Sequence, residues 1–239
     1  MRGLTTAGLG LPDFRNALDQ HEEYIFALES CGLEVIVLPP DESLPDSVFV
    51  EDTALLTPAC AIITRPGALS RRPEVAAVRE ARRAFFRTFE TIRPPGTLDA
   101  GAPMNGGSSI YIGLSERTNR EGARQVQKIL SDHGMQGILV PVQEGLHLKS
   151  GLSYLEDNHL LISRKFLQMP CFEPFEQLRL PECESYAANS VWINNKVLVP
   201  TGFPGALAKI REAGYEIIEL DMSEFRKQDG GLSCLSLRF

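Results

Sequence analysis

The chain has 239 residues, of which 43% are hydrophobic and 23% charged, and its formal net charge is −7. This composition is typical of a globular protein that buries a large core, and its acidity disfavours binding to the phosphate backbone of nucleic acids. No apolar run approaches the roughly 18 residues of a membrane span, and the first residues lack a signal peptide's apolar core. The five cysteines are scattered and never spaced as CxxC, which favours free thiols in the cytoplasm over disulfides or zinc.

Helical and strand patterns alternate from the start of the chain. A helix is predicted over residues 13–32, where Asp13 opens an apolar pattern of helical spacing and Gly32 ends it. Strands are predicted over residues 33–38, 47–56 and 60–64, the last two as a hairpin.

The same alternation continues to the end of the chain. Helices are predicted over residues 73–89, 119–133 and 204–213, each followed by extended segments. The predicted extended segments are residues 97–101, 108–114, 137–142 and 215–220, with hairpins of 146–154 with 159–163 and of 190–193 with 196–199.

Three segments of the chain resemble one another: residues 28–36, 130–138 and 210–218. Each contains a helix end, a glycine and the start of a β-strand. Repeats of about 45 residues indicate a solenoid or a closed ring of modules. No glycine-rich nucleotide fingerprint follows any predicted strand, which disfavours a Rossmann fold.

The repeats place chemically active residues at related positions. Counted from the glycine that ends the preceding helix, Asp52 and Cys234 both lie 20 residues further on, and His147 lies 13 residues further on. In modules arranged around a pseudo-symmetry axis such positions converge. We therefore expect a thiol, a histidine and two acids to meet in one site.

Cys234 is the candidate nucleophile. Two glycines precede it in residues 229–239, a stretch predicted as a buried final strand with the thiol at its mouth. The alternative is a buried cysteine that acts as a small hydrophobe. His147 is the candidate acid or base because it alternates with leucines on a predicted strand, where it shares a face with Lys149. Its alternative role is structural.

Four carboxylates are candidates for binding a cation. Glu51 and Asp52 are adjacent in a predicted strand, so they face opposite sides and one of them points inward. An inward carboxylate is costly unless a cation pairs with it, and a cationic ligand would supply that partner. Asp46 and Asp99 are further candidates. The alternative for each is a role in a turn or a helix cap.

Two arginines are candidates for binding a carboxylate. Arg71 precedes a predicted helix, and Arg117 follows a predicted strand. Each could bind a carboxylate through forked hydrogen bonds. The alternative is a solvated surface charge.

Together these motifs resemble the dimethylarginine dimethylaminohydrolase family of the guanidino-modifying (amidinotransferase and arginine deiminase) superfamily. The matching segments, in the family's order, are residues 46–52, 113–119, 146–149, 186–189 and 229–234. The resemblance implies an α/β fold, a five-bladed αβ propeller that forms a single domain over residues 1–239. Its first blade is expected to be incomplete, because the strand that family members place before the lid does not precede Leu4.

The resemblance also implies a role for each site residue. Cys234 is expected to be the nucleophile, His147 the general acid and base, and Asp99 the residue that assists the histidine. The expected substrate-binding residues are Asp46, Glu51 and Asp52 for the guanidinium, Arg71 and Arg117 for the carboxylate, Asp229 for the amino group, and Leu4 in a mobile lid. This chain departs from the family in one segment, where Asp99 replaces a glutamate and Ala102 replaces an aspartate.

The implied activity is hydrolysis of an Nω-methylated arginine to citrulline and an alkylamine through a covalent thiouronium on Cys234. No metal or organic cofactor is expected. One alternative is hydrolysis of arginine or another guanidine, and a second is a guanidine-binding homologue without catalysis. The expected partner is a small guanidine substrate, with no nucleic acid or membrane, and a homodimer is left open.

Overall fold

The computed structural model of the protein describes residues 3–81, 85–86, 88–143 and 145–239. The described chain divides into two compact units. The first contains Leu38–Ser150 and Ser233–Phe239, and the second contains Gly3–Val37 and Gly151–Leu232. Within the described residues, every helix is too short or too polar to cross a membrane.

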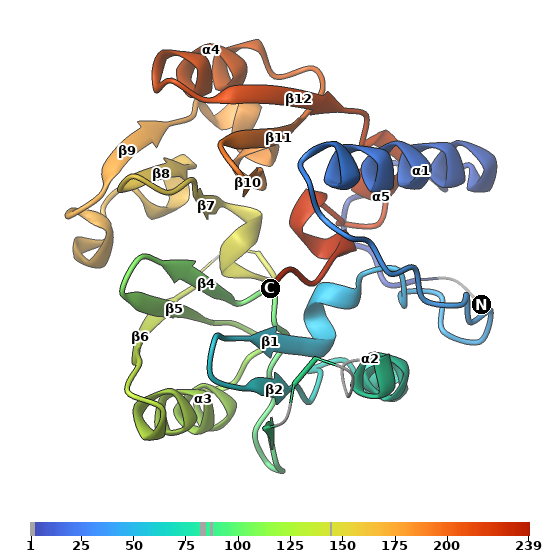
Figure 1. The fold of residues 1–239 in the computed structure, drawn as a ribbon, viewed down its shortest axis with the longest axis vertical. Coiled ribbons are helices and arrows are strands. Elements are labelled where there is room, and N and C mark those ends of the chain that lie inside the picture. The colour runs from blue at the N-terminus through green and yellow to red at the C-terminus, as the bar shows by residue number, and fades with distance from the viewer. Residues whose placement is uncertain (1–2, 82–84, 87, 144) are drawn as a thin grey trace. The chain divides into compact units, whose positions relative to one another are not determined.

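Four three-stranded sheets share one connectivity (Figure 1). In each sheet the first two strands form an antiparallel hairpin, and the third lies parallel to the second after a crossover. The first unit holds β1 (Ala54–Leu56), β2 (Ala61–Ile63) and β3 (Phe89–Thr91), and also β4 (Pro103–Gly106), β5 (Ser109–Leu114) and β6 (Gln136–Pro141). The second unit holds β7 (Leu152–Tyr154), β8 (His159–Ile162) and β9 (Glu176–Arg179), and also β10 (Val191–Ile193), β11 (Lys196–Pro200) and β12 (Glu216–Leu220).

Helical segments make the crossovers. The helices are α1 (Phe14–Ser30), α2 (Val75–Ala81), α3 (Arg120–Asp132), α4 (Pro204–Glu212) and α5 (Ser223–Arg226). α2 lies between β2 and β3, α3 between β5 and β6, and α4 between β11 and β12, whereas short 3-10 turns connect β8 to β9. The modules predicted around residues 130–138 and 210–218 are therefore confirmed as strand–helix–strand units.

The core of the first unit explains why α3 forms where it does. Its buried residues Ala123, Val126 and Leu130 recur at helical spacing and pack against Ile110 and Ile112 of β5. In Figure 1, α3 lies against β5 and β6, as the packing requires.

The second unit repeats this arrangement around α4. Ala206 and Ile210 of α4 pack against Val197 and Val199 of β11 in a fully buried cluster. The hairpin before the helix turns at Asn194 and Asn195, whose φ angles of 47° and 68° are those that a two-residue type I′ turn needs. The predicted hairpin is confirmed.

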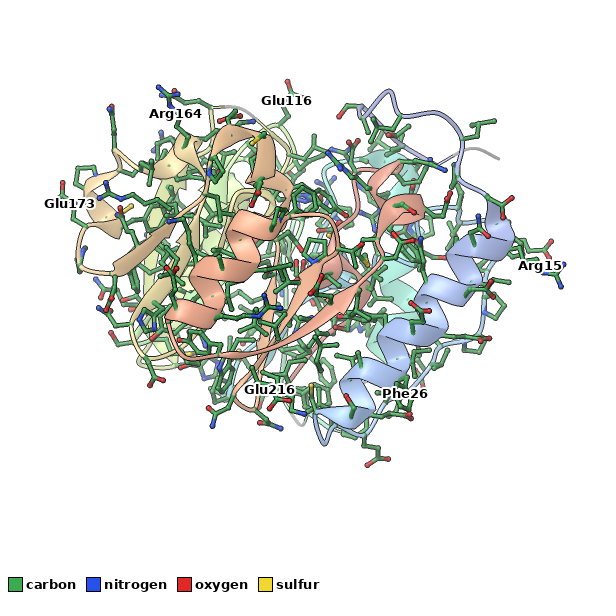
Figure 2. The ribbon with its side chains drawn as sticks, turned by 90° about the horizontal axis from the view of Figure 1, so that it is seen from above. Arg15, Phe26, Glu116, Arg164, Glu173 and Glu216 are labelled. Atoms are coloured by element: carbon green, nitrogen blue, oxygen red, sulfur yellow. The ribbon has the colours of Figure 1, made fainter. Side chains whose placement is uncertain are left out.

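α1 is amphipathic and has a defined start. The Asp13 side chain accepts a hydrogen bond from the backbone N–H of Asn16 at 2.9 Å, which caps the helix. Tyr24 and Leu28 are buried, whereas Phe26 is 72% exposed and projects outward (Figure 2).

The prediction of a strand over residues 33–38 is wrong, because these residues form no strand in the structure. In the other helical modules the strand after the helix pairs with the strand that precedes it. The described residues before α1 form no strand, so residues 33–38 have no preceding strand with which to pair.

Most other differences concern turns in which apolar and polar residues alternate as they do in a strand. Within residues 47–56 only the end is a strand, since Val50–Thr53 forms a 3-10 helix, η1. Leu148–Ser150 and Leu232–Leu235 are likewise 3-10 helices, η4 and η8, and residues 97–101 contribute only a single bridge at Leu98. The helix predicted over residues 73–89 is shorter, because α2 ends at Ala81 and residues 82–84 and 87 lie outside the described residues.

Candidate active site

A buried aspartate orients the imidazole of His147. Asp99 is fully buried, and its Oδ2 lies 3.1 Å from His147 Nε2. Its other oxygen accepts a hydrogen bond from the backbone N–H of Gly67 at 2.8 Å, and its own backbone N–H donates to Thr118 Oγ1 at 3.2 Å. The carboxylate is therefore held from several sides, and the shorter side chain still reaches the histidine.

Asp52 provides a second carboxylate beside the same ring. Its Oδ1 lies 3.7 Å from His147 Nε2 and accepts a hydrogen bond from the backbone N–H of Gly101 at 2.9 Å. Its Oδ2 accepts a hydrogen bond from the guanidinium of Arg71. Since Asp52 is only 3% exposed, these contacts replace water as its partners.

The two carboxylates determine how His147 ionises. Burial alone would lower the pKa of His147, but the negative charge of Asp52 and the hydrogen bond to Asp99 outweigh it, so the pKa is raised above its usual value of 6.5. Burial would raise the pKa of Asp52, but the positive charges of His147 and Arg71 lower it to about 2. The site therefore favours the protonated form of His147 beside the ionised carboxylate of Asp52.

Gly101 is required by the close packing of this site. A Cβ atom at position 101 would lie 2.8 Å from His147 Nδ1 and 2.9 Å from Asp52 Oδ1. Only glycine lets the backbone approach both side chains and donate its N–H to the carboxylate.

Arg71 is buried and uses its donors within the protein. Its Nε and Nη2 contact the carboxylate of Glu74, with the shortest distance 2.7 Å, and its Nη2 also donates to the carbonyl oxygens of Asp46 and Phe49. Together with the bond to Asp52, these contacts connect the predicted carboxylate cluster to the turn before α2.

Glu51 connects the segment of the histidine to the segment of the nucleophile candidate. Its Oε1 lies 2.5 Å from Lys149 Nζ, and its Oε2 accepts a hydrogen bond from Ser233 Oγ at 2.8 Å. Ser233 directly precedes Cys234, which is partly exposed in η8. The structure thus places the predicted nucleophile and His147 on two turns that share one carboxylate.

These contacts correct two details of the sequence analysis. His147 and Lys149 do not share a strand face, because His147 precedes η4 and Lys149 lies within it. Glu51 and Asp52 do not alternate across a strand, because both lie in η1. Both are buried, whereas only one was expected to point inward, and they contact different partners.

Arg117 lies at the edge of the cluster. Its Nη1 is 4.0 Å from Asp99 Oδ2, and its side chain is partly exposed, so it can also reach a ligand. Asp52, Asp99 and His147 offer ligand atoms within 4.8 Å of one another and could hold a metal ion. The same atoms are hydrogen-bonded or ion-paired within the site, an arrangement suited to proton transfer.

Asp229 and Leu4, the two remaining predicted residues, lie in the second unit. Asp229 has a left-handed backbone, with φ of 59°, and its Oδ2 accepts hydrogen bonds from the backbone N–H and Oγ1 of Thr6 at 2.5 and 3.0 Å. Leu4 is 40% exposed. The predicted lid segment is thereby bonded to the turn that contains Asp229.

Sequence patterns do not identify several residues that complete the site. These residues are Gly67, Glu74, Gly101, Thr118, Lys149 and Ser233. Most act through contacts between distant segments, which no local period reveals. Lys149 and Ser233 carry one signal, because each is a polar neighbour of a predicted catalytic residue within an apolar stretch.

Comparison with known proteins identifies relatives over nearly the whole chain. No family model matches the sequence. The chain is 52% identical over 238 residues to the N(G),N(G)-dimethylarginine dimethylaminohydrolase of Pseudomonas aeruginosa, covering 99% of this chain and 94% of that protein. It is 36% identical over 222 residues to the protein of the same name from Streptomyces coelicolor, covering 93% and 85%.

Solved structures agree with these relatives. The fold superposes with a TM-score of 0.98 on a Pseudomonas aeruginosa dimethylarginine dimethylaminohydrolase mutant complexed with citrulline, at 51% identity over 99% of this chain and 93% of that chain. A cyanobacterial arginine dihydrolase domain, ArgZ, shares the α/β fold with a TM-score of 0.86 at 19% identity, covering 95% and 87%. The chain belongs to the N(G),N(G)-dimethylarginine dimethylaminohydrolase family.

Proposed function

We propose that the protein hydrolyses Nω,Nω-dimethylarginine to citrulline and dimethylamine. The proposal rests on the surroundings of His147. Its ring lies 3.1 Å from the buried Asp99, and Glu51 contacts both Lys149, in the turn after His147, and Ser233, in the turn of Cys234. The relatives named for this activity, and the citrulline bound in one of their structures, support the same substrate class.

In the first half of the reaction, the thiolate of Cys234 attacks the guanidinium carbon, and a C–S bond forms as the C–N π electrons move onto nitrogen. His147 gives its proton to the substituted nitrogen, the C–N bond breaks, and dimethylamine leaves. The product is a covalent S-alkyl thiouronium. The raised pKa of His147 supports this role, because it keeps the proton available near neutral pH.

In the second half, His147 takes a proton from water as the oxygen attacks the thiouronium carbon. The C–S bond then breaks, its electron pair returns to Cys234 as a thiolate, the added hydroxyl loses its remaining proton to solvent as the C=O bond forms, and citrulline is released. Asp99 holds the imidazole throughout, and the shared charge of Asp52 and Asp99 stabilises its protonated form. No metal or organic cofactor is needed for either step.

The substrate is proposed to bind through charges at both of its ends. Asp46, Glu51 and Asp52 supply negative charge for the guanidinium. Arg117 and Arg71 are proposed to bind the carboxylate, and Arg71 does so by exchanging one of its bonds to Glu74 or to the carbonyl oxygen of Phe49.

The other end of the substrate and the lid involve the second unit. Asp229 is proposed to bind the amino group, and Leu4 to belong to a lid that closes over the substrate. Asp229 accepts hydrogen bonds from Thr6, which supports a link between the lid segment and amino-group binding.

We also infer that the modules form a five-bladed αβ propeller in one cytoplasmic domain over residues 1–239. The shared connectivity of the four sheets supports this fold. α1 would belong to the fifth module, because Gly32 follows it as Gly134 and Gly214 follow α3 and α4, each with a positive φ angle.

A citrulline and amine assay tests the proposed activity. Dimethylarginine should give citrulline and dimethylamine in equal amounts and faster than arginine gives citrulline, whereas Cys234→Ser should give neither product. Faster turnover of arginine would favour the second hydrolase assignment. Tight binding of dimethylarginine without any turnover would favour a non-catalytic homologue, although the intact contact between Asp99 and His147 argues against it.

A further inference from the structure

We propose that Lys149, Ser233 and Arg238 are positioning residues that act through Glu51 to hold the turn of Cys234 against the segment of His147. The inference rests on the proposed hydrolysis. It concerns how the two reacting groups are kept in place, beyond any contact that Glu51 makes with the substrate.

The first argument is the environment of Glu51. Its carboxylate is buried, with 4% of the residue exposed, and both oxygens have close partners. Lys149 Nζ lies 2.5 Å from Oε1, and Ser233 Oγ donates to Oε2 at 2.8 Å. Arg238 Nη2 lies further away, 3.7 Å from Oε1. A buried carboxylate held in this way has little freedom to move.

The second argument is the position of these partners in the chain. Lys149 follows His147 by two residues, and Ser233 directly precedes Cys234. Glu51 itself precedes Asp52, whose carboxylate lies 3.7 Å from His147 Nε2. The Glu51 carboxylate therefore connects its own segment, which contains Asp52, to the segments that contain His147 and Cys234.

The third argument is the nature of the backbone at these points. Lys149 and Ser233 lie in 3-10 helices of three and four residues, η4 and η8, which have few backbone hydrogen bonds of their own to hold them. Arg238 lies in the irregular tail after η8, where its Nη1 also contacts the carbonyl oxygens of Ser233 and Ser236 at 3.5 and 3.4 Å. Side-chain contacts to Glu51 thus add to the few backbone bonds of these turns, such as the one from Lys149 N–H to the carbonyl oxygen of Gly101 at 3.3 Å.

A steady-state comparison of variants tests the proposal. Lys149→Met should lower kcat by roughly 10²-fold, the cost typical of a misplaced reacting group, while KM changes by less than about threefold. Lys149→Arg should restore most of the rate, because it keeps a cation on Glu51. Ser233→Ala should lower kcat by about tenfold, and Arg238→Met by less, because its contact is longer.

The double variant shows whether the effects share one route. If both residues act through Glu51, the fold-loss in kcat of the double variant, Lys149→Met with Ser233→Ala, should be much smaller than the product of the two single-variant fold-losses. A fold-loss equal to that product would overturn the proposal. A rise in KM at unchanged kcat would also overturn it, because Lys149 would then act on substrate binding.

Two controls separate these outcomes from other failures. Lys128→Met removes an exposed ion pair with Asp132 in the same unit and should leave kcat unchanged. If Lys149→Met does not fold, the Ser233→Ala and Lys149→Gln variants carry the same test. Turnover of dimethylarginine by the wild-type protein tests the proposed function separately. An unchanged kcat in the variants therefore counts against the positioning role alone.

Discussion

At the scale of single residues, the site depends on opposite pKa shifts at His147 and Asp52. The raised pKa of His147 contributes stability that is fully present below the unfolded value of about 6.5 and is lost as the pH rises through the folded pKa. The lowered pKa of Asp52 contributes stability present above about 3.8 and lost as the pH falls through about 2. The pair of Asp52 and protonated His147 therefore stabilises the site between these two limits, and the upper limit lies above the unfolded value of His147.

Asp99→Asn should shift the pH dependence of catalysis. Loss of the carboxylate that bonds to His147 removes one of the influences that raise the pKa of the imidazole. The alkaline limb of the kcat profile should therefore move to lower pH, with a lower maximum. A pH–rate profile from pH 5 to 10 measures this shift, with the exposed Asp132→Asn as the matched control. An alkaline limb at the same pH in both variants would contradict the assignment of His147 as the acid.

At the scale of elements, the 3-10 helices hold most of the chemistry. η1 contains Glu51 and Asp52, η4 follows His147 directly, and η8 contains Cys234. All three were predicted as strands, because their apolar and polar residues alternate. Polar residues at these positions serve the contacts of the site, since Asp52, Lys149 and Ser233 each have a partner in a distant segment. A local period cannot distinguish that origin from a β-strand.

The elements that were predicted have local causes. α3 follows from a cap, a helical apolar period and a glycine end, and the hairpin of β10 and β11 follows from its two asparagines. The strands β3, β4 and β9 have only three or four residues and were not predicted. Cys234 and His147 are candidates from their local sequence, but a definite role for each follows only from the family resemblance, because their convergence depends on the tertiary fold.

Asn119→Ala should destabilise the first unit by about 2 kcal/mol. The Asn119 Oδ1 accepts hydrogen bonds from the N–H groups of Gly122 at 2.8 Å and Thr97 at 3.0 Å, so it caps α3 and ties the helix to the segment before Asp99. Unfolding in urea measures the loss. Asn119→Asp keeps the accepting oxygen and should recover most of the stability, and equal losses in both variants would contradict the capping role.

At the scale of the whole molecule, the two units divide the proposed site. The reacting groups belong to the first unit, whereas Asp229 and Leu4 belong to the second. Neither unit is one continuous piece of chain, since the last seven residues, Ser233–Phe239, belong with Leu38–Ser150. Only four residues separate Asp229 from Cys234, so a short peptide connects the proposed amino-group site to the nucleophile.

Equilibrium unfolding tests whether the chain is one domain, as we propose. Trp192, the sole tryptophan, reports on the second unit, and Cys60, which is fully buried in the first unit, reports through pulsed thiol labelling read by peptide mass spectrometry. In a single cooperative domain the two probes should give the same urea midpoint, because coincident transitions are the mark of two-state unfolding. Asn119→Ala, which acts in the first unit, should then lower both midpoints equally. If only the Cys60 midpoint fell, the units would be separate domains, and the connection between Asp229 and Cys234 would have to act across a boundary that unfolds in parts.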